Sequence, residues 1–250
     1  MGLLKDKVAI ITGASSGIGR AAALMFSAEG ASLVLNARGD AALQEVAQTI
    51  RAQGGQVETV TGDVSLPETH EALVETAVRT YGGLDIAFNN AAMIGVMKPL
   101  AEIELAEWNE TLSSALTSAF LGARSQIPAL LRRGGGSVIF TSSFVGIASG
   151  LPTMGAYAAA KAGLTGLVKG ITADYAAQGI RANALIAGGT DTAMAGDEQQ
   201  KQWAAGLHAM KRIAQPEEIA AAALFLASPM ASFVAGSALF ADGGNSAVKL

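Results

Sequence analysis

Short runs of apolar and β-branched residues alternate along this chain with longer stretches in which apolar residues recur every three or four positions. The short runs are typical of buried strands, and the longer stretches are typical of amphipathic helices. Seven runs predict strands, at residues 7–12, 32–36, 56–60, 84–89, 137–141, 180–186 and 237–240. Strands that alternate with helices indicate a parallel sheet. We therefore predict an α/β fold, a doubly wound parallel sheet of seven strands with helices on both faces.

Glycine and proline mark the ends of several predicted elements. Pro67 suits the first turn of a helix, and Gly82 suits a helix end. Residues 134–136, which are all glycine, separate a long predicted helix at about 104–131 from the next strand. The chain has no linker and no internal repeat, so we predict a single domain over residues 1–250.

Composition narrows the range of functions. Apolar residues make up 50% and charged residues 15% of the chain, which suits a sheet buried between layers of helices. The net charge is -4, and the 17 Lys and Arg form no basic run, which argues against nucleic acid as a partner. There is no cysteine, and His70 and His208 lie far apart in sequence, so we predict no metal site.

The apolar segments also bear on location. The longest apolar run, residues 219–227, is too short to cross a bilayer. The N-terminus MGLLKDKVAI has no apolar stretch of the signal-peptide kind before its first lysine. We therefore expect a cytoplasmic protein without membrane contacts.

The stretch TGASSGIGR, residues 12–20, places three glycines between the first predicted strand and the helix after it. In doubly wound sheets this turn is where a dinucleotide pyrophosphate usually binds. Glycine lets the backbone approach phosphate closely, and the N-terminus of the following helix offers unpaired N–H groups to an anion. The alternative is a tight turn that needs glycine for packing alone.

The spacing Thr-Gly-x-x-x-Gly-x-Gly in this turn resembles the glycine motif of the short-chain dehydrogenase/reductase family. The resemblance covers nearly the whole chain and continues, in the family's order, through NNAA (89–92), YAAAK (157–161) and FADGG (240–244). It implies a Rossmann fold and an activity like that of 3-oxoacyl carrier protein reductases and related ketone reductases. A Tyr four positions before a Lys is weak evidence by itself, but it becomes strong in this order.

Tyr157 and Lys161 form the candidate catalytic pair. They stand at i and i+4 of one predicted helix, which places both side chains on the same face with Cβ atoms about 6 Å apart. The pKa of a tyrosine must fall by roughly 3 units, about 4 kcal/mol, before it acts as a base near neutral pH, and a fixed ammonium together with the positively charged nicotinamide favours this fall. Tyr157 would then exchange a proton with a substrate carbonyl or alcohol. The alternative is a surface tyrosine beside a lysine on a solvated helix.

By the same resemblance, Ser143 is the serine that hydrogen-bonds the substrate oxygen, where its role would be electrostatic. We therefore predict Ser143, Tyr157 and Lys161 as the catalytic residues.

Arg38 bears on the choice of cofactor. The second predicted strand ends in Asn36, Ala37 and Arg38, at the place where a carboxylate would bind the ribose of NAD. An arginine pairs with phosphate in bidentate fashion, so we predict a preference for NADP(H) over NAD(H), with Ser15 as a second phosphate contact. The alternative is an Arg38 that stacks over adenine or faces solvent.

The resemblance assigns a wider set of cofactor contacts. Asp63 with Val64 would border the adenine, Asn89 with Asn90 the ribose side, and Thr192 the nicotinamide amide. The full predicted set is Gly13, Ser15, Ser16, Gly17, Ile18, Gly19, Arg38, Asp63, Val64, Asn89, Asn90, Tyr157, Lys161, Gly188, Thr190 and Thr192. Asp63 also suits a turn cap, and the two asparagines also suit backbone support at a strand end.

Three positions depart from the family pattern. Ala115, seven residues after Trp108, replaces a catalytic asparagine whose backbone carbonyl holds a water linked to the lysine. We expect Ala115 to keep this carbonyl contact and to lose the side chain that distorts the helix. The sequence alone does not determine whether the proton relay is kept. Ala92 and Ala187 replace a glycine and a proline, and the loop after Ala187 is expected to be looser without proline.

We interpret residues 188–210 as a lid over the substrate. Its apolar residues, with those of two other loops, would line a pocket that suits a hydrophobic ketone better than a sugar, although they also suit an ordinary core. The set is Met93, Ile94, Val145, Ile147, Leu151, Met154, Met194, Trp203, Leu207 and Met210. The last predicted strand and FADGG resemble the part of the family that packs across a two-fold axis, and the apolar helix at 216–227 lacks obvious solvent cover. The resemblance and this helix together lead us to predict a homotetramer.

The sequence therefore predicts an NADP(H)-dependent oxidoreductase that interconverts a small-molecule ketone and a secondary alcohol. One alternative is a family member that binds the cofactor without turnover because Ala115 replaces asparagine. Another is a methyltransferase that uses a different adenosine cofactor on a similar sheet. The retained serine, tyrosine and lysine argue against the first, and the glycine spacing with the Tyr-Lys pair argues against the second.

Overall fold

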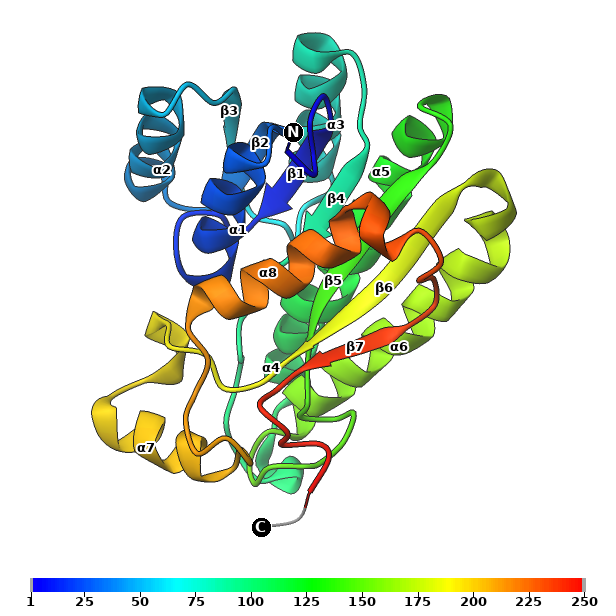
Figure 1. Ribbon diagram of the computed structural model, residues 1–250. Coiled ribbons are helices and arrows are strands. Elements are labelled where there is room, and N and C mark those ends of the chain that lie inside the picture. Colours follow the sequence, from blue (N-terminus) through cyan, green and yellow to red (C-terminus); the bar gives the residue numbers. More distant parts are fainter. Residues whose placement is uncertain (1, 249–250) are drawn as a thin grey trace.

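The computed structural model describes residues 2–248, and its strands form one parallel sheet (Figure 1). The strands are β1 (Val8–Thr12), β2 (Ser32–Ala37), β3 (Val57–Thr61), β4 (Ile86–Asn89), β5 (Gly136–Ser143), β6 (Ile180–Ala187) and β7 (Ala238–Ala241). The α-helices are α1 (Gly17–Ala28), α2 (Asp40–Ala52), α3 (Pro67–Tyr81), α4 (Leu105–Leu112), α5 (Ser118–Arg132), α6 (Gly155–Tyr175), α7 (Glu198–Gly206) and α8 (Pro216–Ala227). Every strand that the sequence predicted is present.

The order of the strands reverses direction between β1 and β4, which is where ligands bind in sheets of this kind. The sheet has the order β3-β2-β1-β4-β5-β6-β7, so the chain runs outward from β1 to β3 and then crosses back to β4 on the other side of β1. In such sheets the reversal between neighbouring strands opens a crevice at their carboxyl ends. Figure 1 shows α7 and the loops that follow β5 and β6 gathered at this end of the sheet.

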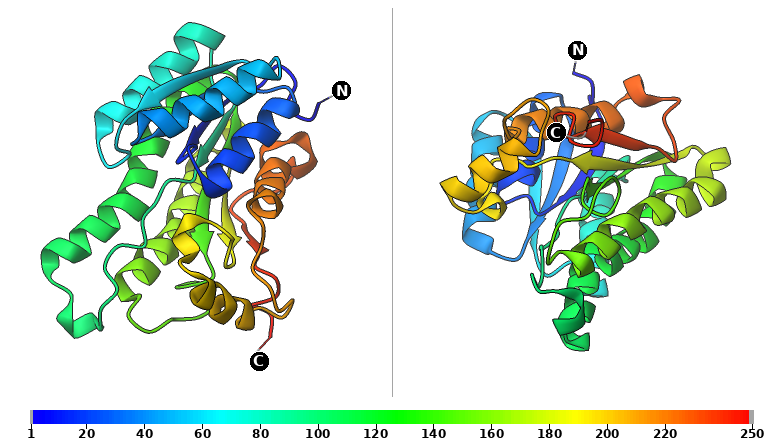
Figure 2. Two further views of the ribbon diagram at one scale, coloured as in Figure 1. Left: turned by 90° about the vertical axis from the view of Figure 1, so that its left-hand side faces the viewer. Right: turned by 90° about the horizontal axis from the view of Figure 1, so that it is seen from below.

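Helices cover both faces of the sheet (Figure 2). On one face α1, α2 and α8 bury a core that includes Phe26, Leu43 and Leu226. On the other face α3, α5 and α6 bury a core that includes Leu73 and Leu130. The predicted doubly wound α/β sheet, with helices on both faces, is thus confirmed, whereas the single domain over residues 1–250 stays a prediction.

The long helix predicted at about 104–131 is divided in the structure. A π-helical turn, Ser113–Thr117, separates α4 from α5, and Ala115 lies at its centre. The expectation that alanine removes the distortion of this helix was therefore wrong. A wider turn of this kind is set by the backbone and its neighbours, and it does not require an asparagine side chain.

One face of the apolar helix at 216–227 is covered within the chain, while Leu224 and Phe225 are only half-buried. Ile219, Ala223 and Leu226 of α8 are buried against the sheet and α1. The helix approaches closely because α1 presents small residues such as Ala22 and Ala23 to it. This face of α8 therefore gives no support to the predicted tetramer.

Within residues 2–248, every helix is too short or too polar to span a bilayer.

Candidate active site

The glycine turn between β1 and α1 has the backbone that the sequence predicted. Gly13 and Gly17 have φ values of +68° and +50°, which L side chains rarely adopt. A Cβ on Gly19 would overlap the carbonyl oxygen of Gly13. Ser16, at the N-cap, makes no side-chain hydrogen bond to the helix, which leaves the first N–H groups of α1 available to an anion. The turn therefore has the form of a phosphate cradle, with Ser15 and Ile18 in the same segment.

Polar side chains at the ends of β1 and β4 hold this turn in place. The hydroxyl of Thr12 accepts hydrogen bonds from the backbone N–H groups of Asn90 and Ala91, both at 3.0 Å. The amide of Asn90 donates to the Thr12 carbonyl at 3.1 Å and accepts from the Thr141 hydroxyl at 3.0 Å. Asn90 therefore ties three neighbouring strand ends together, which is the supporting role considered for it from the sequence.

Asn89 is occupied in a different way. Its side chain forms two reciprocal hydrogen bonds, each 3.0 Å long, with the buried amide of Gln126 on α5. This pairing anchors α5 to the end of β4. The side chain is thus committed to the protein, and its predicted contact with a ribose stays a prediction.

Asn36 and Arg38, at the end of β2, have different roles. Asn36 is buried, and its amide donates to the carbonyls of Val60 and Gly62, which fixes the loop that leads to Asp63. Arg38 is exposed, and its guanidinium donates one hydrogen bond to a described side chain, to the sulfur of Met93 at 3.4 Å.

Asp63 caps a turn, as the sequence allowed. Its carboxylate accepts a hydrogen bond of 2.8 Å from the Ser65 backbone N–H. This bond lowers the pKa of Asp63, burial opposes the effect, and the nearby Arg38 charge adds to it. Asp63 is therefore a carboxylate beside Arg38, in the loop that also carries Val64.

Tyr157 and Lys161 come together on the buried side of α6. The ammonium nitrogen of Lys161 lies 5.6 Å from the centre of the Tyr157 ring, and both residues are at most 9% exposed. Lys161 donates a hydrogen bond of 2.7 Å to the carbonyl of Thr141 on β5. Ser143 is buried at the end of the same strand, and its hydroxyl accepts from the Val145 N–H at 3.1 Å. The three predicted catalytic residues therefore meet at the carboxyl end of β5.

Burial sets the protonation of this pair. It raises the pKa of Tyr157, and the hydroxyl of Ser143 opposes the rise. Burial also lowers the pKa of Lys161 from 10.5 to about 8. Burial thus acts against the fall in the pKa of Tyr157 that the sequence-based argument required, and the spacing of two residues does not reveal how deeply they lie.

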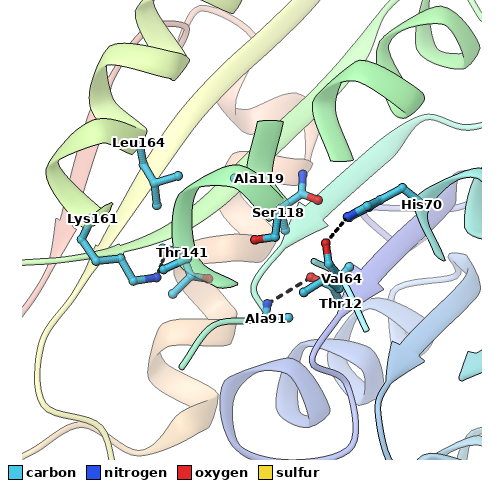
Figure 3. A pocket seen from close by; sticks show the side chains of 11 residues that line it. Thr12, Val64, His70, Ala91, Ser118, Ala119, Thr141, Lys161 and Leu164 are labelled. Atoms are coloured by element: carbon cyan, nitrogen blue, oxygen red, sulfur yellow. Dashed lines mark hydrogen bonds between the residues drawn. The ribbon is translucent and has the colours of Figure 1, made fainter. Parts of the chain in front are cut away.

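A small cavity lies next to Lys161 (Figure 3). Ala115 and Ser118 of the π-turn region line it, together with Thr141, Asn89 and His70. Its volume is about 10 Å³. The position where the chain departs from the family pattern therefore borders a space beside the predicted catalytic lysine.

The loop after β6 faces the glycine turn. Thr192 lies so close to Gly17 that a Cβ on that glycine would meet its methyl group at 2.8 Å. Thr190 is buried, and its hydroxyl donates to the carbonyl of Gly188 at 3.0 Å. The loop that carries the predicted residues Gly188, Thr190 and Thr192 thus lies against the predicted phosphate site.

Sequence reasoning missed the function of His208. Its Nε2 accepts a hydrogen bond of 2.9 Å from the backbone N–H of Gly189, and its Nδ1 is 2.7 Å from the Ala204 carbonyl. The carbonyl can only accept, so Nδ1 carries the proton. His208 therefore fastens the residues after α7 to the loop beside the predicted nicotinamide site, and only the fold brings the two segments together.

Apart from Met93, which is half-buried beside Arg38, the residues predicted to line a pocket divide into two groups. Ile94, Ile147, Leu151, Met154 and Leu207 pack against the core on one face of the sheet, where Val145 is buried. By contrast, Met194, Trp203 and Met210 of the predicted lid are each at least 50% exposed. The lid therefore presents apolar side chains to solvent.

Known proteins match this arrangement over almost the whole chain. The family model described as enoyl-(acyl carrier protein) reductase matches residues 13–246. Cyclohexanol dehydrogenase of Acinetobacter sp. (strain SE19) is 37% identical, with 95% of this chain and 94% of the relative covered. A solved short-chain dehydrogenase/reductase from Burkholderia xenovorans, described as putative, is 33% identical, with 100% of both chains covered and a TM-score of 0.93. This chain belongs to the short-chain dehydrogenase/reductase family.

Membership of the family makes the chain an oxidoreductase that acts on CH–OH groups, as its named relatives do. Among them, 3beta-hydroxysteroid dehydrogenase 1 of Eggerthella lenta is 38% identical, with 96% of this chain and 94% of the relative covered. Carveol dehydrogenase from Mycobacterium avium, solved in complex with NAD, is 27% identical, with 98% of this chain and 99% of that chain covered and a TM-score of 0.93.

Proposed function

We propose that this chain interconverts a hydrophobic ketone and its secondary alcohol with a nicotinamide cofactor, and that Tyr157 exchanges the proton at the substrate oxygen. The observation that carries the proposal is the buried pair of Tyr157 and Lys161, with Ser143 beside the phenol, at the carboxyl end of β5. Relatives named for cyclohexanol, a 3β-hydroxysteroid and carveol support a cyclic, largely apolar substrate.

The residues around the cleft fit a dinucleotide. The glycine turn leaves no room for a Cβ at Gly19, and the N-terminus of α1 offers free N–H groups beside it, which suits a pyrophosphate. The loop with Gly188, Thr190 and Thr192 lies against the same turn, which supports the proposal that it borders the nicotinamide. When bound, the cofactor supplies or accepts the hydride.

The side chains perform the proton chemistry. In the direction of reduction, the hydroxyl of Tyr157 donates its proton to the carbonyl oxygen, and in oxidation the phenolate takes the proton back from the alcohol. Ser143 donates a hydrogen bond to the same oxygen, where negative charge develops. The Lys161 ammonium stabilises the phenolate. Burial raises the pKa of Tyr157, so it favours the protonated phenol that ketone reduction requires.

The direct test follows NADPH consumption by the purified protein against aliphatic, cyclic and aromatic ketones, with a Tyr157→Phe variant alongside. Because the variant keeps the ring and loses the transferable proton, we expect turnover on cyclic ketones to fall at least about 100-fold, with cofactor binding retained. Tight binding of NADPH without turnover on any ketone would favour the non-catalytic alternative. Turnover that Tyr157→Phe leaves intact would remove Tyr157 from the mechanism.

Arg38 supports a preference for NADP(H). It is an exposed cation at the end of β2, and Asn36, which replaces the carboxylate that would repel a 2′-phosphate, is bound to backbone carbonyls. We expect NADPH to bind at least about 10-fold more tightly than NADH, and Arg38→Ala to remove most of this difference. Dissociation constants measured by fluorescence titration test both statements. Equal constants for the two cofactors in the unaltered protein would refute the preference.

A further inference from the structure

The two ring nitrogens of His208 have separate partners. His208 lies just after α7 and is 2% exposed. Its Nδ1 donates to the carbonyl of Ala204, four positions earlier, at 2.7 Å, and so satisfies an end of this helix. Nε2 therefore carries no proton, and it accepts a hydrogen bond of 2.9 Å from the backbone N–H of Gly189. The bond to Gly189 exists only while the ring is neutral.

The ring also packs against the loop that it holds. An added Cβ on Gly188 would meet Nε2 of His208 at 2.7 Å, and one on Gly189 would meet Cε1 at 3.0 Å. On another side the ring of Phe144 lies edge-on to the imidazole, with the ring centres 6.1 Å apart. His208 thus restrains a loop in which Ala187, in place of the family's proline, does not stiffen the backbone.

The other bonds that hold this loop do not depend on pH near neutrality. The backbone of Ala214 accepts from the N–H of Asp191 and donates to the carbonyl of Gly189, both at 2.8 Å. The carboxylate of Asp191 also pairs with Lys201 of α7 at 2.7 Å, and this bond raises the pKa of Lys201. Exposed carboxylates and ammonium groups keep their charge between about pH 5 and 8, whereas histidine changes its charge there. The bond to His208 is therefore the one that responds to acid.

Besides the ion pair just described, two charged side chains belong to the segments around His208. Asp242 follows β7, and its carboxylate accepts hydrogen bonds from the backbone N–H groups of Gly244 and Ser246 at 3.0 and 2.9 Å. Lys211 is exposed. The carboxylate that faces the histidine from β7 is thus already bound to backbone N–H groups of its own loop.

We propose that His208 is a proton-sensitive clasp for the loop over residues 188–192. The neutral ring holds this loop against the glycine turn, where Thr192 lies beside Gly17. Protonation places a hydrogen on Nε2 opposite the N–H of Gly189, so two donors face each other and the bond is lost. Binding of the nicotinamide cofactor therefore weakens as the pH falls.

His208 is thus a positioning residue, because it acts on the cofactor through the loop. The effect on the cofactor rests on the proposed function. The release of the loop by acid does not rest on it.

The first test is hydrogen exchange of the backbone N–H groups in residues 188–192, measured by mass spectrometry without cofactor. After correction for the intrinsic effect of pH, we expect exchange in the unaltered protein to be at least about 10-fold faster at pH 5.5 than at pH 7.5. Helix α2, residues 40–52, is the internal control and is expected to keep its corrected rates. Equal corrected rates in the loop at both pH values would overturn the clasp, whether or not the protein binds a nicotinamide.

Two substitutions divide the two bonds of His208. His208→Gln offers a carbonyl oxygen near the position of Nε2, so it keeps an acceptor for Gly189 and gives up the donor to Ala204. His208→Asn offers an amide nitrogen near the position of Nδ1, so it keeps the donor and gives up the acceptor. Neither amide takes up a proton in this range of pH. If His208 only caps α7, Asn is the better replacement; if it holds the loop, Gln is.

The second readout is the dissociation constant of NADP⁺, measured by calorimetry at pH 7.5 and pH 5.5. Because a phosphate monoester itself titrates near pH 6, the unaltered protein is compared with His208→Gln, which binds the same cofactor. We expect the loss of affinity on acidification to be at least about 5-fold larger in the unaltered protein than in His208→Gln. His208→Asn is expected to bind at least about 10-fold more weakly than the unaltered protein at pH 7.5.

The outcomes separate this proposal from the proposed function. An equal loss of affinity in the unaltered protein and His208→Gln would overturn the clasp, as would tighter binding by His208→Asn than by His208→Gln at pH 7.5. No binding of NADP⁺ by any of the three proteins would contradict the proposed function instead, and the hydrogen exchange of the loop would then decide whether His208 is a clasp.

Discussion

At the scale of single residues, the buried Lys161 makes stability depend on pH in a fixed direction. Its pKa in the folded chain is about 8, against 10.5 for an ordinary lysine. Between these values the unfolded chain binds more protons than the folded chain, so the free energy of unfolding rises as the pH increases from about 8 to 10.5. At pH 7 the buried charge costs about 3 kcal/mol.

Replacement of Lys161 by methionine removes this cost. We expect Lys161→Met to be more stable than the unaltered protein at pH 7, by up to about 3 kcal/mol less the lost bond to Thr141, and the gain to shrink toward pH 10.5. Urea unfolding at pH 7 and pH 10 measures the difference. Lys169→Met, at an exposed position of the same helix, is the control. A gain that does not change with pH would contradict the shifted pKa.

Single residues also show where sequence reasoning ends. The i, i+4 spacing correctly placed Tyr157 and Lys161 on one face of a helix. It did not reveal their burial, which raises the pKa of Tyr157 and so acts against the fall that the mechanism requires. The role of His208 depends on a contact with Gly189 across nineteen positions, which no local pattern indicates. The sequence therefore predicted which residues form the catalytic pair. It did not predict their protonation or their hydrogen-bond partners.

At the scale of elements, the helix around Ala115 also differs from what the sequence predicted. The sequence predicted one continuous helix without distortion, but the chain forms α4, a π-turn and α5. Apolar periodicity places a helix and its buried face, and it is too coarse to detect one extra residue in a turn. The turn retained at Ala115 supports the view that the backbone of this site is kept while one side chain is changed.

The turn from β1 to α1 is an element whose glycines can be tested one at a time. A methyl group on Gly19 would overlap the Gly13 carbonyl, so we expect Gly19→Ala to displace the turn, to lower the free energy of unfolding by at least about 2 kcal/mol and to weaken NADPH binding at least about 10-fold. Denaturation and fluorescence titration measure the two effects.

The matched control is Gly170→Ala, at an exposed position in the second half of α6, where nothing lies within 4 Å of the added carbon. Because alanine favours a helix over glycine, this variant is expected to gain up to about 1 kcal/mol and to bind NADPH normally. If Gly19→Ala behaved like the control, the turn would not need its close backbone approach.

At the scale of the whole molecule, the order of strands and helices was predictable because each element carries its own pattern, and alternating strands and helices permit few arrangements. Which apolar faces remain free was not predictable. Alpha-helix α8 looks unpartnered in sequence, yet α1 covers it through contacts that depend on the sheet between them. Surface apolar residues are thus identified only once the whole fold is known.

Exposed apolar residues at the last strand support the predicted homotetramer. β7 is an edge strand of the sheet, and Phe240 on it is 45% exposed, while Phe233, in the segment just before it, is fully exposed. A short edge strand with exposed phenylalanines is a natural place for a second copy to pack. We expect light scattering to give the mass of four chains, and Phe233→Ser with Phe240→Ser to give a smaller species.

A control at another apolar surface position makes this test specific. Leu105, at the start of α4, is 72% exposed. Its helix packs on α6 and not on β7. Leu105→Ser is expected to keep the mass of the unaltered protein. A monomer mass for the unaltered protein would refute the tetramer, and dissociation by Leu105→Ser alone would place the interface on α4 instead of on β7.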